Sequence, residues 1–264
     1  MKYNYLFLDI DGVLLNRETD TSEDCWRLLS GLKDKGVSVS FITSRPYGLT
    51  KHLSDKIKGY EVGIYDNGGY VAGHEENELI SENVVTISPK LLQLLSKELD
   101  LNPYFMIGIS CHNIFYCNQI YYDYLGTYMT NHGYTKNTND NMLRRLETKN
   151  INSVWIKNSS KRFVDEVTKL TLLNIKISLN KDSIFIHPSA SVKENGLLSL
   201  ALNKNIDLNK TIFIGDTDSD IGVAKLVSLS ACPMNATDNI KKIANFVSEK
   251  YFSDSIIDVI VSYM

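Results

Sequence analysis

Two short apolar runs, far apart in the chain, are each followed directly by aspartates, and they constrain the fold more than any other feature. Residues 3–8 form a largely apolar run that ends at Asp9, and the run TIFI at 211–214 precedes a second acidic turn. Continuous apolar runs of this length are typical of strands buried on both faces, as in a parallel sheet. The sequence therefore predicts at least two such strands.

Helix-like segments alternate with these strands. Apolar residues 25, 28, 29 and 32 repeat at helical spacing, with Ser22 placed to cap the helix and Gly36 placed to end it. A strand over 37–42, a helix over 47–58, a strand over 62–65 and a glycine turn at 66–69 follow. The alternation returns past His187, with a helix at 196–203, the strand at 211–214, a helix after Asp218, apolar stretches at 227–231 and 246–247, and a closing helix to Tyr263. This order predicts an α/β fold with a Rossmann-like parallel-sheet core.

The middle of the chain has a different pattern. Apolar runs come in hairpin-like pairs, 104–110 with 113–118 and 174–179 with 183–187. Helix candidates begin at Ser88 and span 160–173, and the asparagine-rich stretch 131–141 is predicted as a loop. We therefore expect residues 1–78 and 184–264 to form the core, and residues 79–183 to form an inserted α+β module.

Composition excludes several classes of protein. The 264 residues include 28 Lys plus Arg and 31 Asp plus Glu, a net charge of −3, so no nucleic acid or anionic membrane is expected as a partner. The four cysteines form no CxxC pair, and no apolar stretch approaches the length of a membrane span. The N-terminal apolar run reaches an acid too soon for a signal peptide, and we expect a cytoplasmic protein.

Candidate functional residues lie where strands end, which is where open α/β sheets bind ligands. Asp9 and Asp11 follow the first strand. Two carboxylates at this spacing can have different roles: one can attack a substrate or bind a metal, and the other can donate or accept a proton. Gly12 would let the backbone turn tightly around a ligand. A plain Asp-Gly turn remains an alternative for this segment.

Two further positions supply groups that favour an anion. Thr43 ends the second strand in FITSRP, where its hydroxyl and the following amides can donate to an anionic oxygen. Lys193 precedes an apolar helix and supplies a compact positive charge. A helix cap for Thr43 and a solvated surface position for Lys193 are the alternatives.

The acidic turn GDTDSD holds Asp216, Asp218 and Asp220, which would repel one another unless a cation neutralised them. The sequence excludes a calcium loop of the EF-hand type. Counted from Asp216, the sixth position is Ile221 instead of glycine and the twelfth is Val227 instead of glutamate. A P-loop motif is also absent from the sequence. A few carboxylates beside a phosphate oxygen suit magnesium better.

Together these motifs resemble the haloacid dehalogenase-like hydrolases, and within them the Cof-type phosphatases with an α+β cap. DIDGVLL resembles the first motif, Thr43-Ser44-Arg45 the second, Lys193 the third and Gly215–Asp220 the fourth. The turn DNGG and the segment NATDNIKKIANFVS resemble further parts of that family. The resemblance covers about 1–80 and 184–264, and the middle matches only as a cap of suitable length and character.

The resemblance implies a Mg²⁺-dependent phosphomonoester hydrolase that works through an aspartyl-phosphate, on a small phosphorylated metabolite such as a sugar phosphate. It assigns the nucleophile to Asp9, the acid/base to Asp11, phosphate binding to Thr43, Ser44 and Lys193, metal binding to Asp9, Asp11, Asp216 and Asp220, and candidate substrate binding to Arg45 and Asn67. Three residues differ from the usual motifs of that family, namely Ser44, Glu194 and Ser219. None of these differences removes a catalytic carboxylate. A phosphosugar mutase and a non-catalytic protein that binds metal or phosphate are the alternatives.

Overall fold

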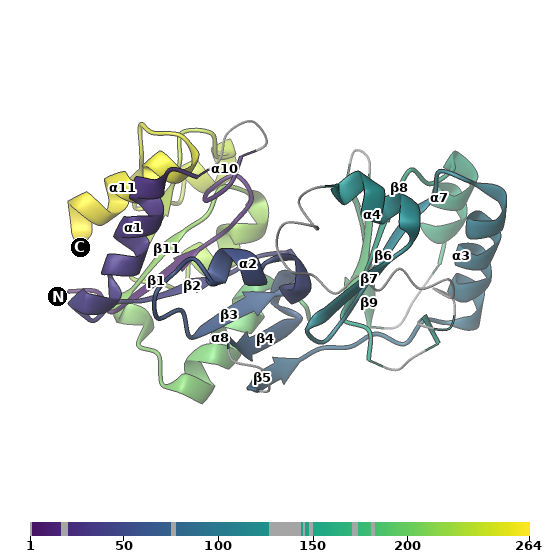
Figure 1. Ribbon diagram of the computed structural model, residues 1–264, viewed down its shortest axis with the longest axis horizontal. Helices are drawn as coiled ribbons and strands as arrows, with labels where there is room; N and C mark the ends of the chain where they lie inside the picture. The colour runs from purple at the N-terminus through teal and green to yellow at the C-terminus, as the bar shows by residue number, and fades with distance from the viewer. Residues whose placement is uncertain are drawn as a thin grey trace. The chain divides into compact units, whose positions relative to one another are not determined.

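The computed structural model describes residues 2–16, 21–74, 78–126, 144, 146–147, 150–170, 174–180 and 183–264. The chain forms two compact units. The first comprises Met1–Arg45, Lys51–Ser81 and Val192–Met264, and the second comprises Pro46–Thr50 and Glu82–Ser191. Figure 1 colours the chain from its N-terminus to its C-terminus, so that the segments of each unit can be traced.

The first unit is built on a parallel sheet of strand order β13-β12-β11-β1-β2. Its strands are β1 (Tyr5–Leu8), β2 (Ser38–Phe41), β11 (Thr211–Ile214), β12 (Leu229–Cys232) and β13 (Phe246–Val247). The predicted strands are all present, and β1 lies between β2 and β11 with Leu8 opposite Phe41 and Ile214. All five carboxyl ends therefore meet at one edge of the sheet.

Alternate residues of the central strands point to opposite faces, so each face has its own core. Leu6, Leu8, Ile212 and Ile214 pack with apolar side chains of α1 (Glu23–Gly31) and α11 (Phe252–Tyr263), which lie side by side in Figure 1. Phe7 and Phe213 pack on the other face, against α8 (Lys193–Lys204) and α9 (Ile221–Ala224). Helices on both faces are the arrangement of a doubly wound α/β core, as the sequence predicts.

The predicted cap of α1 is confirmed. Ser22 accepts a hydrogen bond from the N–H of Cys25, and Gly36 adopts a left-handed φ of 76° after the short helix η1 (Lys33–Lys35). Further short helices of this unit are η3 (Asp66–Gly68), η4 (Leu208–Lys210), η5 (Asp218–Asp220) and α10 (Asp238–Lys241).

A second, three-stranded sheet of the first unit has the order β3-β4-β5. It contains β3 (Val62–Tyr65), β4 (Tyr70–Gly73) and β5 (Leu79–Glu82). Because β5 pairs with β4, the first unit extends to Ser81, beyond the boundary expected after residue 78. The second unit likewise extends past residue 183 to Ser191, because the strand there pairs within it.

The helix predicted over 47–58 is shorter and broken. It is replaced by η2 (Tyr47–Leu49) and α2 (Lys51–Ser54). The break separates the two units: Pro46–Thr50 belongs to the second unit, where Leu49 packs with Met106 and Phe115. Tertiary packing therefore overrides the local helical pattern here.

The second unit holds an antiparallel sheet of order β7-β6-β8-β10-β9. Its strands are β6 (Met106–Cys111), β7 (Ile114–Cys117), β8 (Ser153–Lys157), β9 (Ile175–Asn180) and β10 (Ser183–Pro188). The two predicted hairpins are confirmed as the antiparallel pairs β6 with β7 and β9 with β10.

One face of this antiparallel sheet packs on two helices, α3 (Pro89–Leu101) and α7 (Lys161–Val167). Side chains of Ser88 and Ser160 cap these helices by accepting N–H bonds from Leu91 and Phe163. On the opposite face, Phe115 and Cys117 pack with Tyr121 of α4 (Gln119–Leu125). This α+β unit agrees with the predicted cap.

Part of the predicted middle region lies outside the described residues, including the whole asparagine-rich stretch 131–141 and residues 171–173 of one predicted helix. Within the part of the chain that the structure describes, no helix is both long and apolar enough to cross a membrane.

Candidate active site

Asp9 lies directly after β1, at the carboxyl edge of the parallel sheet. Its own N–H donates to the carbonyl of Ile214 at 2.9 Å, which continues the β1–β11 pairing by one residue. The residue is 5% exposed, and its side-chain Oδ1 accepts a hydrogen bond from the N–H of Ile10 at 2.8 Å. Asp9 is thus a buried carboxylate with one oxygen fixed by the backbone.

Lys193 is the first residue of α8, and its side chain is 1% exposed. Its Nζ lies 2.9 Å from Asp9 Oδ2 and 2.7 Å from Asp220 Oδ1. Burial lowers the pKa of this ammonium, but the charges of Asp220 and Asp9 outweigh burial and leave the pKa raised. The predicted phosphate-binding lysine is therefore a charged group inside the site, and the solvated alternative is wrong.

The glycine turn after β3 fixes the start of α8. Gly68 has a φ of 89°, and a Cβ on it would come within 2.2 Å of the Val192 carbonyl oxygen. The turn also has positive φ at Asp66 and Asn67, whereas Gly69 has a φ of −79°. Of the two glycines in the predicted turn, Gly68 therefore has a positive φ and Gly69 does not, and Gly68 lets the turn lie against the residue before Lys193.

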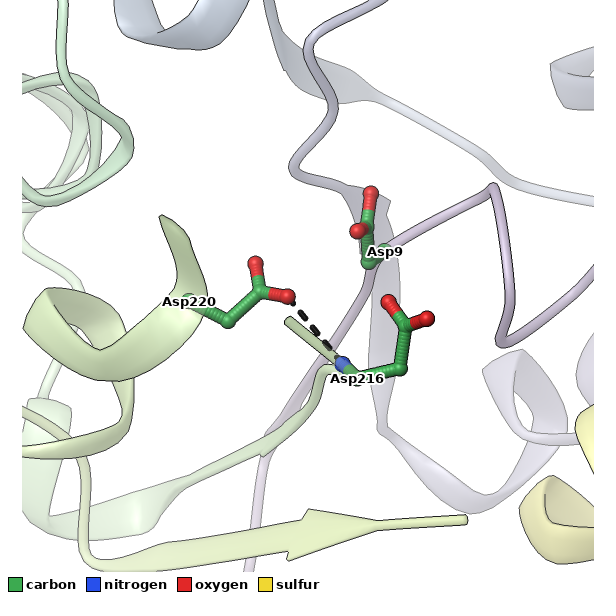
Figure 2. A group of neighbouring side chains, drawn as sticks. All are labelled: Asp9, Asp216 and Asp220. Atoms are coloured by element: carbon green, nitrogen blue, oxygen red, sulfur yellow. Dashed lines mark hydrogen bonds between the residues drawn. The ribbon is translucent and has the colours of Figure 1, made fainter. Parts of the chain in front are cut away.

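Asp216 and Asp220 follow β11 and complete a cluster with Asp9 (Figure 2). Each of the three can place one carboxylate oxygen within 4.8 Å of the others, and all three residues are buried. Asp220 Oδ2 accepts hydrogen bonds from the N–H groups of Asp216 at 3.1 Å and Thr217 at 3.0 Å. Both oxygens of Asp220 are thus engaged, one by Lys193 and one by the turn.

Asp216 differs from its neighbours because its Oδ1 is buried and has no hydrogen-bond partner among the described residues. Burial, and next the charge of Asp220, raise the pKa of Asp216 to about 7. Burial likewise raises the pKa of Asp9 well above its usual value, although Lys193 opposes the shift. Three buried carboxylates share one ammonium, so the cluster holds surplus negative charge that suits a divalent cation.

Gly12 leaves room for Asp216. Its φ is 85°, and a Cβ at this position would come within 1.9 Å of Asp216 Oδ2. The carbonyl of Gly12 accepts a hydrogen bond from Asn235 Nδ2 at 2.8 Å, while Asn235 Oδ1 accepts from the N–H of Phe252 at 3.0 Å. Sequence reasoning did not single out Asn235, although it lies in the tail segment that carried part of the resemblance.

Asp11 is set apart from the buried cluster. Its side chain is 61% exposed, and Arg45 holds both of its oxygens: Nε lies 2.7 Å from Oδ2 and Nη2 lies 2.6 Å from Oδ1. The structure therefore pairs two residues to which the sequence assigned separate roles, and the side chain of Asp11 is not among the clustered carboxylates.

The remaining predicted phosphate groups lie at the end of β2. Thr43 is buried, its N–H donates to the Ile64 carbonyl at 2.9 Å, and its Oγ1 accepts the N–H of Arg45 at 3.0 Å. Ser44 Oγ donates to Asn67 Oδ1 at 3.3 Å. Because β2 neighbours β1, Thr43 and Asp9 lie at adjacent strand ends. Thr43 caps no helix among the described residues, because η2 has Pro46 at its N-cap, so the contact of Thr43 Oγ1 belongs to the turn after β2.

Asp218 takes no part in the cluster. It is exposed and accepts hydrogen bonds from Thr237 Oγ1 at 2.7 Å and Asn239 Nδ2 at 2.8 Å, which lower its pKa. The N–H of Thr237 in turn donates to the Asp216 carbonyl at 2.8 Å. Asp218 thus fixes the loop behind Asp216, a role that its position in the sequence does not reveal.

Known proteins resemble the chain over nearly its whole length. A protein of Streptococcus pyogenes serotype M6, whose name marks it as a candidate phosphatase, is 24% identical over 94% of both chains. Among solved structures, a haloacid dehalogenase-like hydrolase from Bacteroides thetaiotaomicron has a TM-score of 0.82 at 18% identity and covers 99% of this chain and 100% of its own. A subclass IIB sugar phosphatase has a TM-score of 0.72 at 17% identity, with 97% and 98% covered.

These likenesses agree with the predicted fold, and the structural ones show the fold alone. The family itself is shown by a sequence match: the model of the haloacid dehalogenase-like hydrolases matches residues 6–260. That range includes both strand ends, the inserted unit and every residue of the cluster around Lys193. The chain is therefore a member of the haloacid dehalogenase-like hydrolase family.

Proposed function

We propose that the protein is a Mg²⁺-dependent phosphomonoester hydrolase that acts through an aspartyl-phosphate on Asp9. The observation that carries the proposal is the buried cluster at the carboxyl ends of β1 and β11. It combines a carboxylate nucleophile, an ammonium 2.9 Å from that nucleophile, and an Asp216 oxygen without a partner among the described residues. Family membership and the names of the relatives support the same activity.

The residues present fit a magnesium ion. Mg²⁺ prefers a few oxygen ligands and keeps several waters, which suits carboxylates beside a phosphate. Asp216 Oδ1 is the strongest candidate ligand, because burial without a partner is costly for a carboxylate oxygen. Asp9 and the backbone carbonyl of Asp11 are the further ligands we propose, and Asp220 orients Lys193 and the turn. When bound, the ion neutralises charge on the carboxylates and on the transferring phosphoryl group.

In the first half-reaction, a carboxylate oxygen of Asp9 attacks phosphorus while the bond from phosphorus to the ester oxygen breaks. The ester oxygen takes a proton from the carboxyl of Asp11 and leaves as an alcohol, so Asp9 carries the phosphoryl group and Asp11 becomes a carboxylate. Lys193 and the hydroxyls of Thr43 and Ser44 stabilise the negative charge of the phosphoryl oxygens.

In the second half-reaction, Asp11 takes a proton from water as the water oxygen bonds to phosphorus. The bond between phosphorus and Asp9 breaks, phosphate leaves, and Asp9 is again a carboxylate while Asp11 is protonated. Burial favours the neutral form of Asp9, and the charge of Lys193 opposes this shift and so favours the anionic nucleophile.

The substrate we propose is a small phosphorylated metabolite, with sugar phosphates first among the candidates. The similar fold of a sugar phosphatase supports this class. In this proposal the first unit is the catalytic core, and the α+β unit Glu82–Ser191 is the cap that selects the substrate. Asn67, whose side chain contacts Ser44, remains a candidate substrate residue.

The test is hydrolysis of 4-nitrophenyl phosphate with and without a chelator. We expect turnover that requires Mg²⁺ and an acid-stable phosphoryl group on Asp9, identified by mass measurement of quenched enzyme. Asp9→Asn should form none, whereas Asp11→Asn should form the phosphoenzyme and retain it. Metal binding with no turnover would contradict the hydrolase proposal, and conversion of one hexose phosphate isomer into another would identify a mutase.

A further inference from the structure

The acid/base and the nucleophile are held in different ways. Asp9 is held by burial, by a backbone N–H and by Lys193, whereas Asp11 is largely exposed. An exposed aspartate can adopt several rotamers, yet proton transfer requires it within hydrogen-bond reach of the leaving oxygen. Some group must therefore restrain the Asp11 side chain.

Arg45 makes the contacts that such a restraint requires. Its Nε and Nη2 donate to separate oxygens of Asp11 at 2.7 and 2.6 Å. A two-bond pairing between guanidinium and carboxylate fixes direction as well as distance, which a single bond or a lysine cannot do. The Arg45 side chain is 21% exposed, so it is itself partly enclosed.

The backbone on both sides of this pair is fixed. The N–H of Arg45 donates to Thr43 Oγ1 at 3.0 Å, and its carbonyl accepts the N–H of Asp66 at 3.0 Å. The turn that carries Asp11 is closed by the N–H of Gly12, which donates to the Leu15 carbonyl at 2.9 Å. The side-chain pair thus joins two rigid segments at the ends of β1 and β2.

We propose that Arg45 is a positioning residue that holds the Asp11 carboxyl group in place for both proton transfers. The proposal rests on the proposed function, and it assigns Arg45 to Asp11 instead of to the substrate. When Asp11 is the proton acceptor, both of its oxygens accept hydrogen bonds from Arg45. When it carries the proton on one oxygen, the other oxygen still accepts the bond from Arg45.

The test compares Arg45→Gln and Arg45→Lys with two aryl phosphates whose leaving groups differ in their need for a proton. The leaving group of 2,4-dinitrophenyl phosphate departs as a stable anion and needs no proton, whereas that of phenyl phosphate is helped by the acid. In single-turnover experiments, transfer to Asp9 from phenyl phosphate should slow by a factor on the order of 10², which is what a displacement of a catalytic group by about 1 Å can cost. Transfer from the dinitrophenyl ester should stay nearly unchanged.

A second readout is the fate of the phosphoenzyme. With 2,4-dinitrophenyl phosphate, both Arg45 variants should accumulate aspartyl-phosphate, because Asp11 no longer activates water efficiently. Adding Arg45→Gln to Asp11→Asn should cause little further loss, since residues that act as one unit are non-additive. Arg162→Gln is the matched control: it removes an exposed arginine paired with Glu166 at 2.8 Å in the second unit, and it should leave all rates unchanged.

Three results would overturn the inference. Equal slowing with both esters and no accumulated phosphoenzyme would show that Arg45 binds substrate. Unchanged rates would show that the pair has no catalytic role, and faster transfer from phenyl phosphate would show that Arg45 restrains Asp11 from acting. If wild-type protein forms no phosphoenzyme with either ester, the proposed function fails first, before the variants are compared. Circular dichroism melting confirms that each variant is folded.

Discussion

Gly12 offers a direct test of how the site is built. Replacing it by alanine has two separate effects: a side chain at a φ of 85°, and a Cβ 1.9 Å from Asp216 Oδ2. To restore an ordinary contact of 3.4 Å, the Asp216 carboxylate must retreat by about 1.5 Å. A displacement of about 1 Å at a catalytic group can cost about 10²-fold in rate, so we expect Gly12→Ala to lose at least this factor.

Gly36→Ala is the matched control for the backbone effect. Gly36 has a φ of 76°, and apart from its two chain neighbours no heavy atom of the described residues lies within 4 Å of where a Cβ would stand. Both variants should lose about 1 to 2 kcal/mol of unfolding free energy, the cost of a left-handed alanine. Only Gly12→Ala should also lose activity, because only its new methyl group displaces a proposed metal ligand.

Urea denaturation and Mg²⁺ titration of 4-nitrophenyl phosphate turnover measure the two effects. The Mg²⁺ concentration for half-maximal activity should rise in Gly12→Ala and stay unchanged in Gly36→Ala. If folded Gly12→Ala protein keeps the wild-type rate and the wild-type Mg²⁺ dependence, the close approach of Asp216 is not the reason for a glycine at position 12. Equal losses of activity in Gly12→Ala and Gly36→Ala would refute the same explanation, because backbone strain alone would then account for both losses.

Two further predictions concern charge in the cluster. The pKa of Asp216 is raised to about 7 in the metal-free folded protein, against about 3.9 for an unfolded aspartate. The contribution of Asp216 to the unfolding free energy is therefore present at low pH and is lost as the pH rises from about 4 to above 7. Melting temperature in chelator should fall over that window and Mg²⁺ should reduce the fall; a flat profile in chelator would contradict the shift. Lys193→Met should abolish turnover and lower the unfolding free energy by about 3 to 5 kcal/mol, because two buried carboxylates lose their cation. Urea denaturation in chelator measures this loss, and a loss near zero would mean that the ammonium does not stabilise the carboxylates.

The sequence predicted well what depends on local pattern. The strands β1 and β11, the cap of α1 and the start of α3 follow from apolar runs and from single residues at helix starts, and the structure has them where expected. The resemblance then selected Lys193, which composition alone would leave on the surface. The strands and the helix caps were accessible because each is decided by neighbours in the chain, whereas the burial of Lys193 depends on its contacts with Asp9 and Asp220.

Features decided by contacts between distant segments were not accessible. Arg45 and Asp11 are 34 positions apart, and the spacing of their motifs does not reveal that their side chains pair. Asn235 and Gly12 are 223 positions apart, and they meet because β12, which Asn235 follows, lies in the same sheet as β1 with only β11 between them. The helix predicted over 47–58 failed for the same reason, because Leu49 packs in another unit than the residues after Thr50.

Five aspartates in two motifs look alike in sequence, and their surroundings separate them. Asp218 is exposed and holds a loop, and Asp11 is exposed and paired with Arg45. Asp220 is buried, but both of its oxygens are engaged, by Lys193 and by backbone N–H groups. Asp9 has one oxygen on the Ile10 N–H and one beside Lys193, whereas Asp216 Oδ1 has no partner among the described residues. A cation that enters the cluster therefore gains most from Asp216, while Asp9 can ligate it only through an oxygen that already accepts the Ile10 N–H or faces Lys193.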